Sequence, residues 1–226
     1  MLTSLMKRVA ARCSPSTQHE LRRLFFRRQI RGRAFFTDER EYGLLDTWLA
    51  QDDWVLDIGA NVGHYTMRMS ELVGANGRVI AIEPVPETFA LLAANVRLFA
   101  HANVSLFNVA TSDRTAAVGM QIPRFEQGLP NYYQARLTEE PASLTVLGIA
   151  IDTLALPMRI KLAKLDVEGH ELPTLKGMRG LLERDHPVII VETGSQATVV
   201  FLEELGYATR RLPGSSNLVC ELRPGK

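Results

Sequence analysis

The stretch VLDIGANVGHYT, residues 55–66, decides the fold of this chain. An apolar run ends in an acid, Asp57, and two glycines follow it, Gly59 and Gly63. An apolar strand that leads through glycines into a helix is typical of nucleotide-binding α/β folds, because glycine lets the backbone approach a ligand and the first N–H groups of the helix face it. The dinucleotide pattern G-x-G-x-x-G is missing, however, and a bulky Asn-Val pair stands where a pyrophosphate would need room.

Apolar runs and amphipathic segments alternate along most of the chain. Strands are expected at 54–58, 77–83, 104–110, 159–169 and 187–192, and helices at 63–73, 86–99, 171–183 and 196–205. Strands buried on both faces and separated by helices predict a doubly wound α/β fold with a mostly parallel sheet. Two short strands around PGSS, residues 213–216, are expected to form a closing hairpin.

Residues 113–158 interrupt this alternation with a β-rich insertion before the fourth strand. Residues 116–123 and 143–151 are expected to be strands, and the segment between them is rich in turn formers and carries Tyr132 and Tyr133. Because insertions on α/β cores often build binding sites, we expect this segment to form a mobile lid over a substrate site.

The composition of the 226 residues, 46% hydrophobic and 23% charged, fits one globular domain, expected at 38–226, behind a basic, partly helical arm at 1–37. Leu21, Leu24 and Phe25 fall near one helical face, which we expect to pack on the domain while the arginines stay solvated. Contact of the arm with an anionic membrane surface is a less favoured alternative, since the helix lacks an uninterrupted apolar face. The arm carries a single acid, Glu20, against the cations Lys7, Arg8, Arg12, Arg22, Arg23, Arg27, Arg28, Arg31 and Arg33.

The formal net charge is +1, so no nucleic-acid partner is expected. No apolar run reaches the roughly 18 residues of a spanning helix, and the basic N-terminus lacks the apolar stretch of a secretory signal. Cys13 and Cys220 lie too far apart in the sequence to suggest a disulfide framework or a metal site. These features favour a cytoplasmic protein.

Two acids follow consecutive strands of the expected sheet, and their tips should meet at one edge. Glu83, at the end of the second strand, could accept hydrogen bonds from a ribose diol, and Asp57 would attract an ammonium group but repel a diphosphate. S-adenosylmethionine carries a diol, an ammonium and a sulfonium and no phosphate, so this pattern favours it over NAD. The alternative is that both acids only cap helices.

Several motifs together resemble the FkbM family of class I S-adenosylmethionine-dependent methyltransferases. They are DIGANVGHYT (57–66), IEPVPETFALLAANV (82–96), NVATSD (108–113), IDTLALP (151–157), KLDVEGHELPTLKGM (164–178) and VIIVET (188–193). The resemblance implies a Rossmann-like seven-stranded sheet with a reversed last strand, and acceptors that are hydroxyl groups of sugars, polyketides and other small molecules. It also implies cofactor contacts at Asp57, Gly59, Ala60, Asn61, Gly63, Tyr65, Glu83, Ser112, Asp113 and Asp166, with Ser112 and Asp113 beside the adenine.

Five ionisable residues crowd KLDVEGHE, and such charges should pair with one another or meet a ligand. Methyl transfer to a hydroxyl needs the proton removed, for which Asp166 and His170 are the candidate bases, with Lys164 a further candidate catalytic residue and proximity alone an alternative. No metal-ligand spacing is present, so no metal is expected, although Asp166, Glu168 and Glu192 could offer oxygens to Mg²⁺.

The sequence thus predicts an enzyme that methylates a hydroxyl on a small molecule, a sugar, or a glycan or lipid precursor. A methyltransferase for RNA or protein, and a cofactor-binding module without activity, remain the alternatives.

Overall fold

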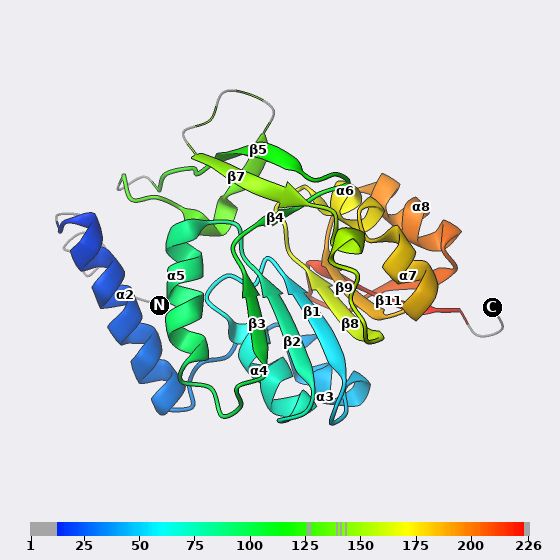
Figure 1. Cartoon of the computed structure of the whole chain (residues 1–226), viewed down its shortest axis with the longest axis horizontal. Coiled ribbons are helices and arrows are strands. Elements are labelled where there is room, and N and C mark those ends of the chain that lie inside the picture. The colour runs from blue at the N-terminus through cyan, green and yellow to red at the C-terminus, as the bar shows by residue number, and fades with distance from the viewer. Residues whose placement is uncertain (1–12, 126–127, 139, 141, 143, 224–226) are drawn as a thin grey trace.

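A seven-stranded sheet forms the centre of the protein in the computed structural model, which describes residues 13–125, 128–138, 140, 142 and 144–223 (Figure 1). The strand order is β10-β11-β9-β8-β1-β2-β3, and only β11 runs antiparallel to its neighbours. The expected doubly wound α/β sheet with a reversed last strand and a closing hairpin is therefore confirmed. The bounds are β1 Trp54–Ile58, β2 Arg78–Ile82, β3 Val104–Phe107, β8 Ile160–Leu165, β9 Val188–Glu192, β10 Tyr207–Arg211 and β11 Asn217–Leu222.

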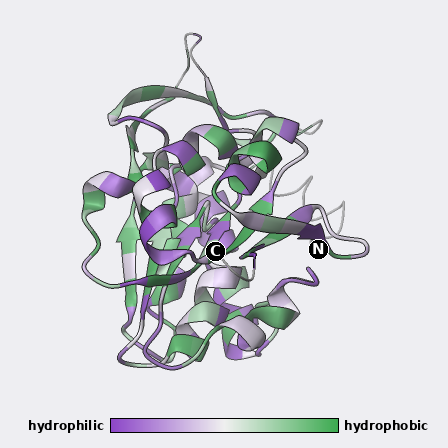
Figure 2. Ribbon diagram, turned by 90° about the vertical axis from the view of Figure 1, so that its right-hand side faces the viewer, coloured by the Kyte–Doolittle hydropathy of each residue, from purple (hydrophilic) through white to green (hydrophobic). Residues whose placement is uncertain are grey.

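Helices cover both faces of this sheet because alternate strand residues are apolar on each side. Val55 and Leu162 pack with Met69 on one face, whereas Leu56 and its neighbours pack with Leu182 on the other. The helices of Figure 2 accordingly alternate hydrophobic and hydrophilic residues. The first face carries α3 (Leu45–Trp48), α4 (His64–Val73) and α5 (Pro86–Val96), and the second carries α6 (Glu171–Lys176), α7 (Arg179–Asp185) and α8 (Gln196–Glu204).

A smaller sheet lies above the carboxyl ends of β1, β2 and β3, to which their arrows point in Figure 1. It has the order β4-β7-β5-β6 and supplies the β-rich insertion expected before the fourth long strand. Its strands are β4 Ala110–Thr111, β5 Ala116–Gln121, β6 Arg136–Thr138 and β7 Leu144–Ile149, and the 3-10 turn η2, Tyr132–Gln134, precedes β6; η1 (Tyr42–Leu44) and η3 (Ile151–Leu154) lie elsewhere.

Several expected element boundaries were wrong, and three of them have a local cause in the structure. The third strand ends at Phe107, because the Asn108 side chain donates hydrogen bonds to the carbonyls of Glu83 and Pro84 and the chain leaves the sheet. The fourth ends at Leu165, before a turn in which two residues have positive φ. The helix expected at 171–183 is two helices, because Gly177 packs so closely on the Ser112 carbonyl that a Cβ would lie 1.9 Å from its oxygen.

The arm contains α2, Pro15–Arg31, whose first turn is capped by the Ser14 hydroxyl accepting from the Thr17 N–H. α2 lies along α5 and buries Phe26 (Figure 1). The expectation that Leu21 and Leu24 pack on the domain was wrong, because each is 48% exposed. Phe25, in contrast, is partly buried.

Residues 1–12 of the expected arm lie outside the described residues. In the part of the chain that is described, no helix combines the length and the apolar character that crossing a bilayer requires.

Candidate active site

A cleft of about 590 Å³, open to solvent, lies where the strand order reverses between β1 and β8. The floor comes from the carboxyl ends of β1, β2 and β8, and the roof from Met120, Tyr132, Ala135 and Leu137 of the insertion. The edge of the sheet predicted to bind a ligand is therefore the edge that carries the cleft.

The loop after β1 has the glycines it needs for its own shape. Gly59 has φ +78°, and a Cβ there would lie 1.8 Å from the backbone oxygen of Asp166. Gly63 has φ +99° and begins α4, where a Cβ would lie 2.7 Å from Cδ1 of Leu92. Asn61, at φ +51°, is of the residue type that tolerates this region best after glycine. Close packing of the loop on β8 and α5 thus requires these glycines.

Glu83 follows β2 and lines the cleft while its carboxylate holds two loops together. Its two oxygens accept the backbone N–H groups of Asn61 and Val85, each at 2.9 Å. Burial raises the pKa of Glu83 to about 7, although these two donors oppose the rise. Because each carboxylate oxygen has a second lone pair, Glu83 can still accept from a diol in the cleft.

Asp57 lies beneath the cleft rather than in its wall. Its side chain is fully buried, one oxygen accepts the Thr66 hydroxyl at 2.5 Å, and the other has no hydrogen-bond partner among the described residues. Burial raises the pKa of Asp57, against the pull of Lys164 and the Thr66 hydrogen bond. This buried oxygen is a vacant acceptor beside the loop, which suits a donor such as an ammonium group.

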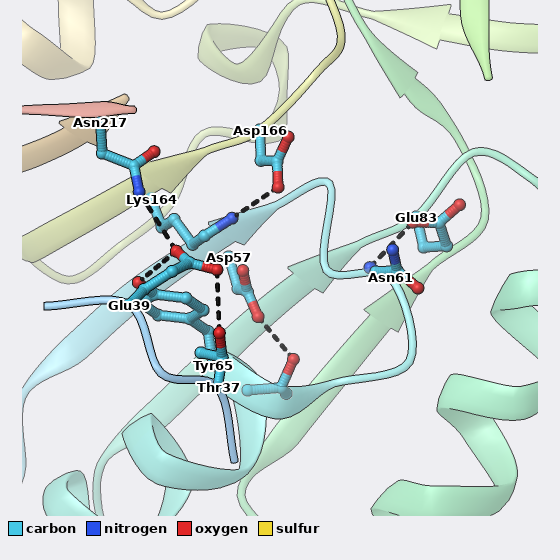
Figure 3. Close-up of polar contacts among 10 residues, drawn as sticks. Thr37, Glu39, Asp57, Asn61, Tyr65, Glu83, Lys164, Asp166 and Asn217 are labelled. Atoms are coloured by element: carbon cyan, nitrogen blue, oxygen red, sulfur yellow. Dashed lines mark hydrogen bonds and ion pairs between the residues drawn. The ribbon is translucent and has the colours of Figure 1, made fainter. Parts of the chain in front are cut away.

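Lys164 is the buried cation that opposes the rise in the pKa of Asp57. Strand register sets it beside Asp57, and its Nζ lies 3.1 Å from Oδ2 of Asp166 and 4.8 Å from the centre of the Tyr65 ring (Figure 3). Burial lowers the pKa of Lys164, but the surrounding carboxylates, that of Asp166 first, outweigh it and raise the pKa above its ordinary value. Lys164 therefore remains an ammonium that holds Asp166 in place.

Glu39 closes this network from the segment before β1. Its carboxylate accepts the Tyr65 hydroxyl at 2.8 Å and the Asn217 amide at 3.1 Å, so the beginning and the end of the domain are joined under the site (Figure 3). The roles of Glu39, Thr66 and Asn217 were not predicted from the sequence. For Thr66 and Asn217, the one available signal was a polar residue at a position expected to face the core.

A second cavity, of about 700 Å³, opens beyond the ends of β8 and β9 and shares Asp166 and Glu168 with the cleft. Glu171, Glu192 and Arg211 line it as well. Burial, followed by repulsion from the neighbouring acids, raises the pKa of Glu168 to about 7. Glu168 was expected, with the other ionisable residues of KLDVEGHE, to pair or to meet a ligand, and it was named as a possible magnesium ligand but not as a base. Its crowding by acids in KLDVEGHE was a signal that its pKa would be shifted.

His170 lines the cleft just before α6, and its Nε2 lies 2.9 Å from the Ser112 hydroxyl. Burial lowers the pKa of His170, so its ring is neutral at pH 7. Ser112 also donates to Asp113 at 3.3 Å. Neither Ser112 nor Asp113 is among the residues that line the cleft, where Thr111 takes the place expected of them.

The structure thus divides the residues singled out from the sequence into two groups. The cleft is lined by Gly59, Asn61, Glu83, Asp166 and His170. The others support this wall from behind or beside it: Asp57, Ala60, Gly63, Tyr65, Ser112, Asp113 and Lys164. In the described part of the chain, no three His, Cys, Asp or Glu side chains are grouped as a metal ion would require.

A family model, the methyltransferase FkbM domain, matches residues 57–208. The chain is 28% identical, over 146 residues, to the hexuronic acid methyltransferase AglP of Haloferax volcanii. That match covers 62% of this chain and 56% of AglP, so the chain spans little more than half the length of this curated relative.

Solved structures show the same fold at low identity. A methyltransferase FkbM from Methylobacillus flagellatus KT superposes with a TM-score of 0.52 at 16% identity, covering 75% of this chain and 43% of the other. Fibrillarin of Aeropyrum pernix, solved with natively bound S-adenosyl-L-methionine, gives 0.51 at 14% identity over 80% and 73% of the two chains. The architecture is that of class I methyltransferases.

Proposed function

The chain belongs to the FkbM family of S-adenosylmethionine-dependent methyltransferases, and we propose that it transfers a methyl group to a hydroxyl of a sugar or of a precursor that carries one. The observation that carries this proposal is the pair of cavities that meet at Asp166 and Glu168. One has the acceptors that suit the cofactor, and the other has the carboxylates that suit a polyhydroxylated acceptor.

The residues of the first cleft fit S-adenosylmethionine. Glu83 would hold the ribose diol through its remaining lone pairs, and the unpartnered oxygen of Asp57 would attract the ammonium from below the loop. Bound there, the cofactor supplies a methyl group on a sulfonium. The insertion contributes Tyr132 to the roof of this cleft.

The second cavity supports a sugar as the acceptor. Carboxylates accept hydrogen bonds from sugar hydroxyls, and Glu168, Glu171 and Glu192 line this cavity together with Arg211. The similarity to a hexuronic acid methyltransferase points in the same direction. A near-neutral chain with an acid-lined acceptor cavity is a poor match for an RNA substrate, whose phosphates the carboxylates would repel.

Proton removal from the acceptor is assigned to Glu168. It lines both cavities, and a pKa of about 7 matches a general base that works near neutral pH. Asp166 is ion-paired with Lys164, so it is suited to be a fixed negative charge beside a sulfonium. His170, neutral and held by Ser112, is the competing candidate.

Incubation with S-adenosylmethionine and a panel of hexuronic acids, their glycosides and nucleotide-linked sugars, followed by mass spectrometry, tests the reaction. We expect a mass gain of one methyl on a sugar hydroxyl. Glu168→Gln should lower kcat about 100-fold or more and remove the pH limb near 7, while cofactor affinity stays unchanged. Glu183→Gln, an exposed acid on α7, is the matched control.

If His170→Asn removes the pH limb and Glu168→Gln does not, the base is His170. Methylation of RNA or protein without any sugar product would overturn the acceptor class. Calorimetric binding of the cofactor without turnover on any acceptor would instead favour the binding module.

A further inference from the structure

The outward face of α2 combines exposed leucines with arginines. The structure exposes six large hydrophobic side chains among the described residues, and two of them, Leu21 and Leu24, belong to α2. The helix lies at the edge of the molecule (Figure 1). It also exposes three arginines, Arg27, Arg28 and Arg31. Exposed apolar side chains that lie together and are bordered by polar residues can mark an interaction surface.

The rotation of α2 places these residues together. Phe26 is buried, and Arg22 and Phe25 face inward beside it, so one side of the helix is committed to α5. At 100° per residue, Leu21 and Leu24 fall on the opposite side. Arg27, Arg28 and Arg31 fall within the same half of the helix surface, so the exposed face is both apolar and basic.

The charge of this face is not neutralised by the helix itself. The only acid of α2, Glu20, is paired with Arg23 at 2.9 Å. Arg27, Arg28 and Arg31 have no ion pair in the part of the chain that the structure describes. A helix of this kind, with apolar side chains among free arginines, is suited to lie in the interface of a bilayer that contains anionic lipids.

We propose that α2 docks the protein on an anionic phospholipid surface through Leu21, Leu24 and the arginines Arg27, Arg28 and Arg31. The helix also contacts the roof of the cleft, because the Arg22 guanidinium lies 5.3 Å from the centre of the Tyr132 ring. This proposal does not depend on the acceptor of the methyl group.

Co-sedimentation of the full chain with phosphatidylcholine vesicles, with and without phosphatidylglycerol, tests the proposal. We expect binding only to the anionic vesicles, weakening as salt rises. The triple variant Arg27→Gln, Arg28→Gln and Arg31→Gln should lower the partition coefficient about 100-fold, since each cation near the surface contributes about fivefold. The control Arg179→Gln, Arg210→Gln and Arg223→Gln removes the same charge from the far side of the molecule and should bind like the wild type.

The variant Leu21→Gln with Leu24→Gln separates a membrane from other partners, because it changes no charge and glutamine is a good helix former. We expect it to lower the partition coefficient by about fivefold per leucine. Unchanged vesicle binding in this variant together with tight, salt-sensitive binding to heparin would show a polyanion site and overturn the proposal. So would equal loss in the control triple variant, no binding of the wild type, or a dimer in sedimentation velocity that the leucine variant dissolves.

Discussion

Replacing Gly59 by alanine should separate two reasons for a glycine in the loop after β1. The first is the backbone conformation, since φ is +78°, and the second is space, since a Cβ would lie 1.8 Å from the oxygen of Asp166. Gly169 is a matched control because its φ is +92° and a Cβ there would have no heavy atom within 4 Å. Gly169→Ala therefore carries the conformational term alone.

The two variants should differ in stability by a predictable amount. An L-residue in the left-handed region costs about 1–2 kcal/mol, and this cost lowers the stability of both variants. Alanine also lowers the conformational entropy of the unfolded chain, which offsets part of the cost in both. Overpacking costs typically about 1–3 kcal/mol more, and it applies at Gly59 only. The free energy of unfolding should thus fall by about 1–3 kcal/mol more in Gly59→Ala than in Gly169→Ala.

Urea unfolding followed by circular dichroism measures this difference, and calorimetry with S-adenosylmethionine measures its effect on the site. Relief of the clash must move either the loop or the end of β8, so Gly59→Ala should also bind the cofactor more weakly. Equal destabilisation of the two variants would show that the close approach to Asp166 is not a constraint, and the account of the loop would be wrong.

Three further outcomes follow from the buried charges and the roof of the cleft. Because the pKa of Glu83 is raised to about 7, its stability contribution is complete below its ordinary pKa and is lost as the pH rises through 7; Glu83→Gln should remove roughly 2.5 kcal/mol of the fall in unfolding free energy measured between pH 5 and pH 8. Lys164→Met should destabilise by about 3–5 kcal/mol at pH 7, with a smaller loss at acid pH where its carboxylate partners are protonated, and an unchanged loss across pH would contradict the network. Hydrogen exchange at 129–137, around Tyr132, should be fast in the free protein and slow with S-adenosylhomocysteine and acceptor both bound, whereas slow exchange throughout would show a fixed roof.

The order of strands and helices could be predicted because the inner strands of the large sheet are mostly apolar runs and the helices between them are periodic. The positions of Asp57 and Glu83 after consecutive strands also follow from the sequence, since parallel strands end at one edge. The burial and contacts of these two side chains at that edge could not be predicted. Asp57 was expected to meet the ligand, yet it is enclosed beneath the loop, because alternation along β1 points it to the face covered by α4.

Contacts between distant segments decided the remaining differences. Periodicity shows which residues of α2 share a face, but only the aromatic cluster of Phe26 and Phe35 shows which face is buried. The break between α6 and α7 likewise depends on Ser112, some 65 residues earlier, which no local pattern at Gly177 reveals.

Asp166 and Glu168 of KLDVEGHE lie two residues apart, and their different neighbours suit them to different roles in the proposed reaction. Asp166 lies 3.1 Å from the buried ammonium of Lys164, so its negative charge is compensated and fixed in direction. Glu168 itself has φ +49°. Its burial and the acids around it outweigh the effect of Lys164 and raise its pKa. A carboxyl group whose pKa is raised toward 7 can take up a proton at neutral pH, whereas a carboxylate held by a buried ammonium can serve as a charge beside the sulfonium. In the proposed reaction, therefore, the turn after β8 places a proton acceptor at the boundary of the two cavities without bringing a second free carboxylate there.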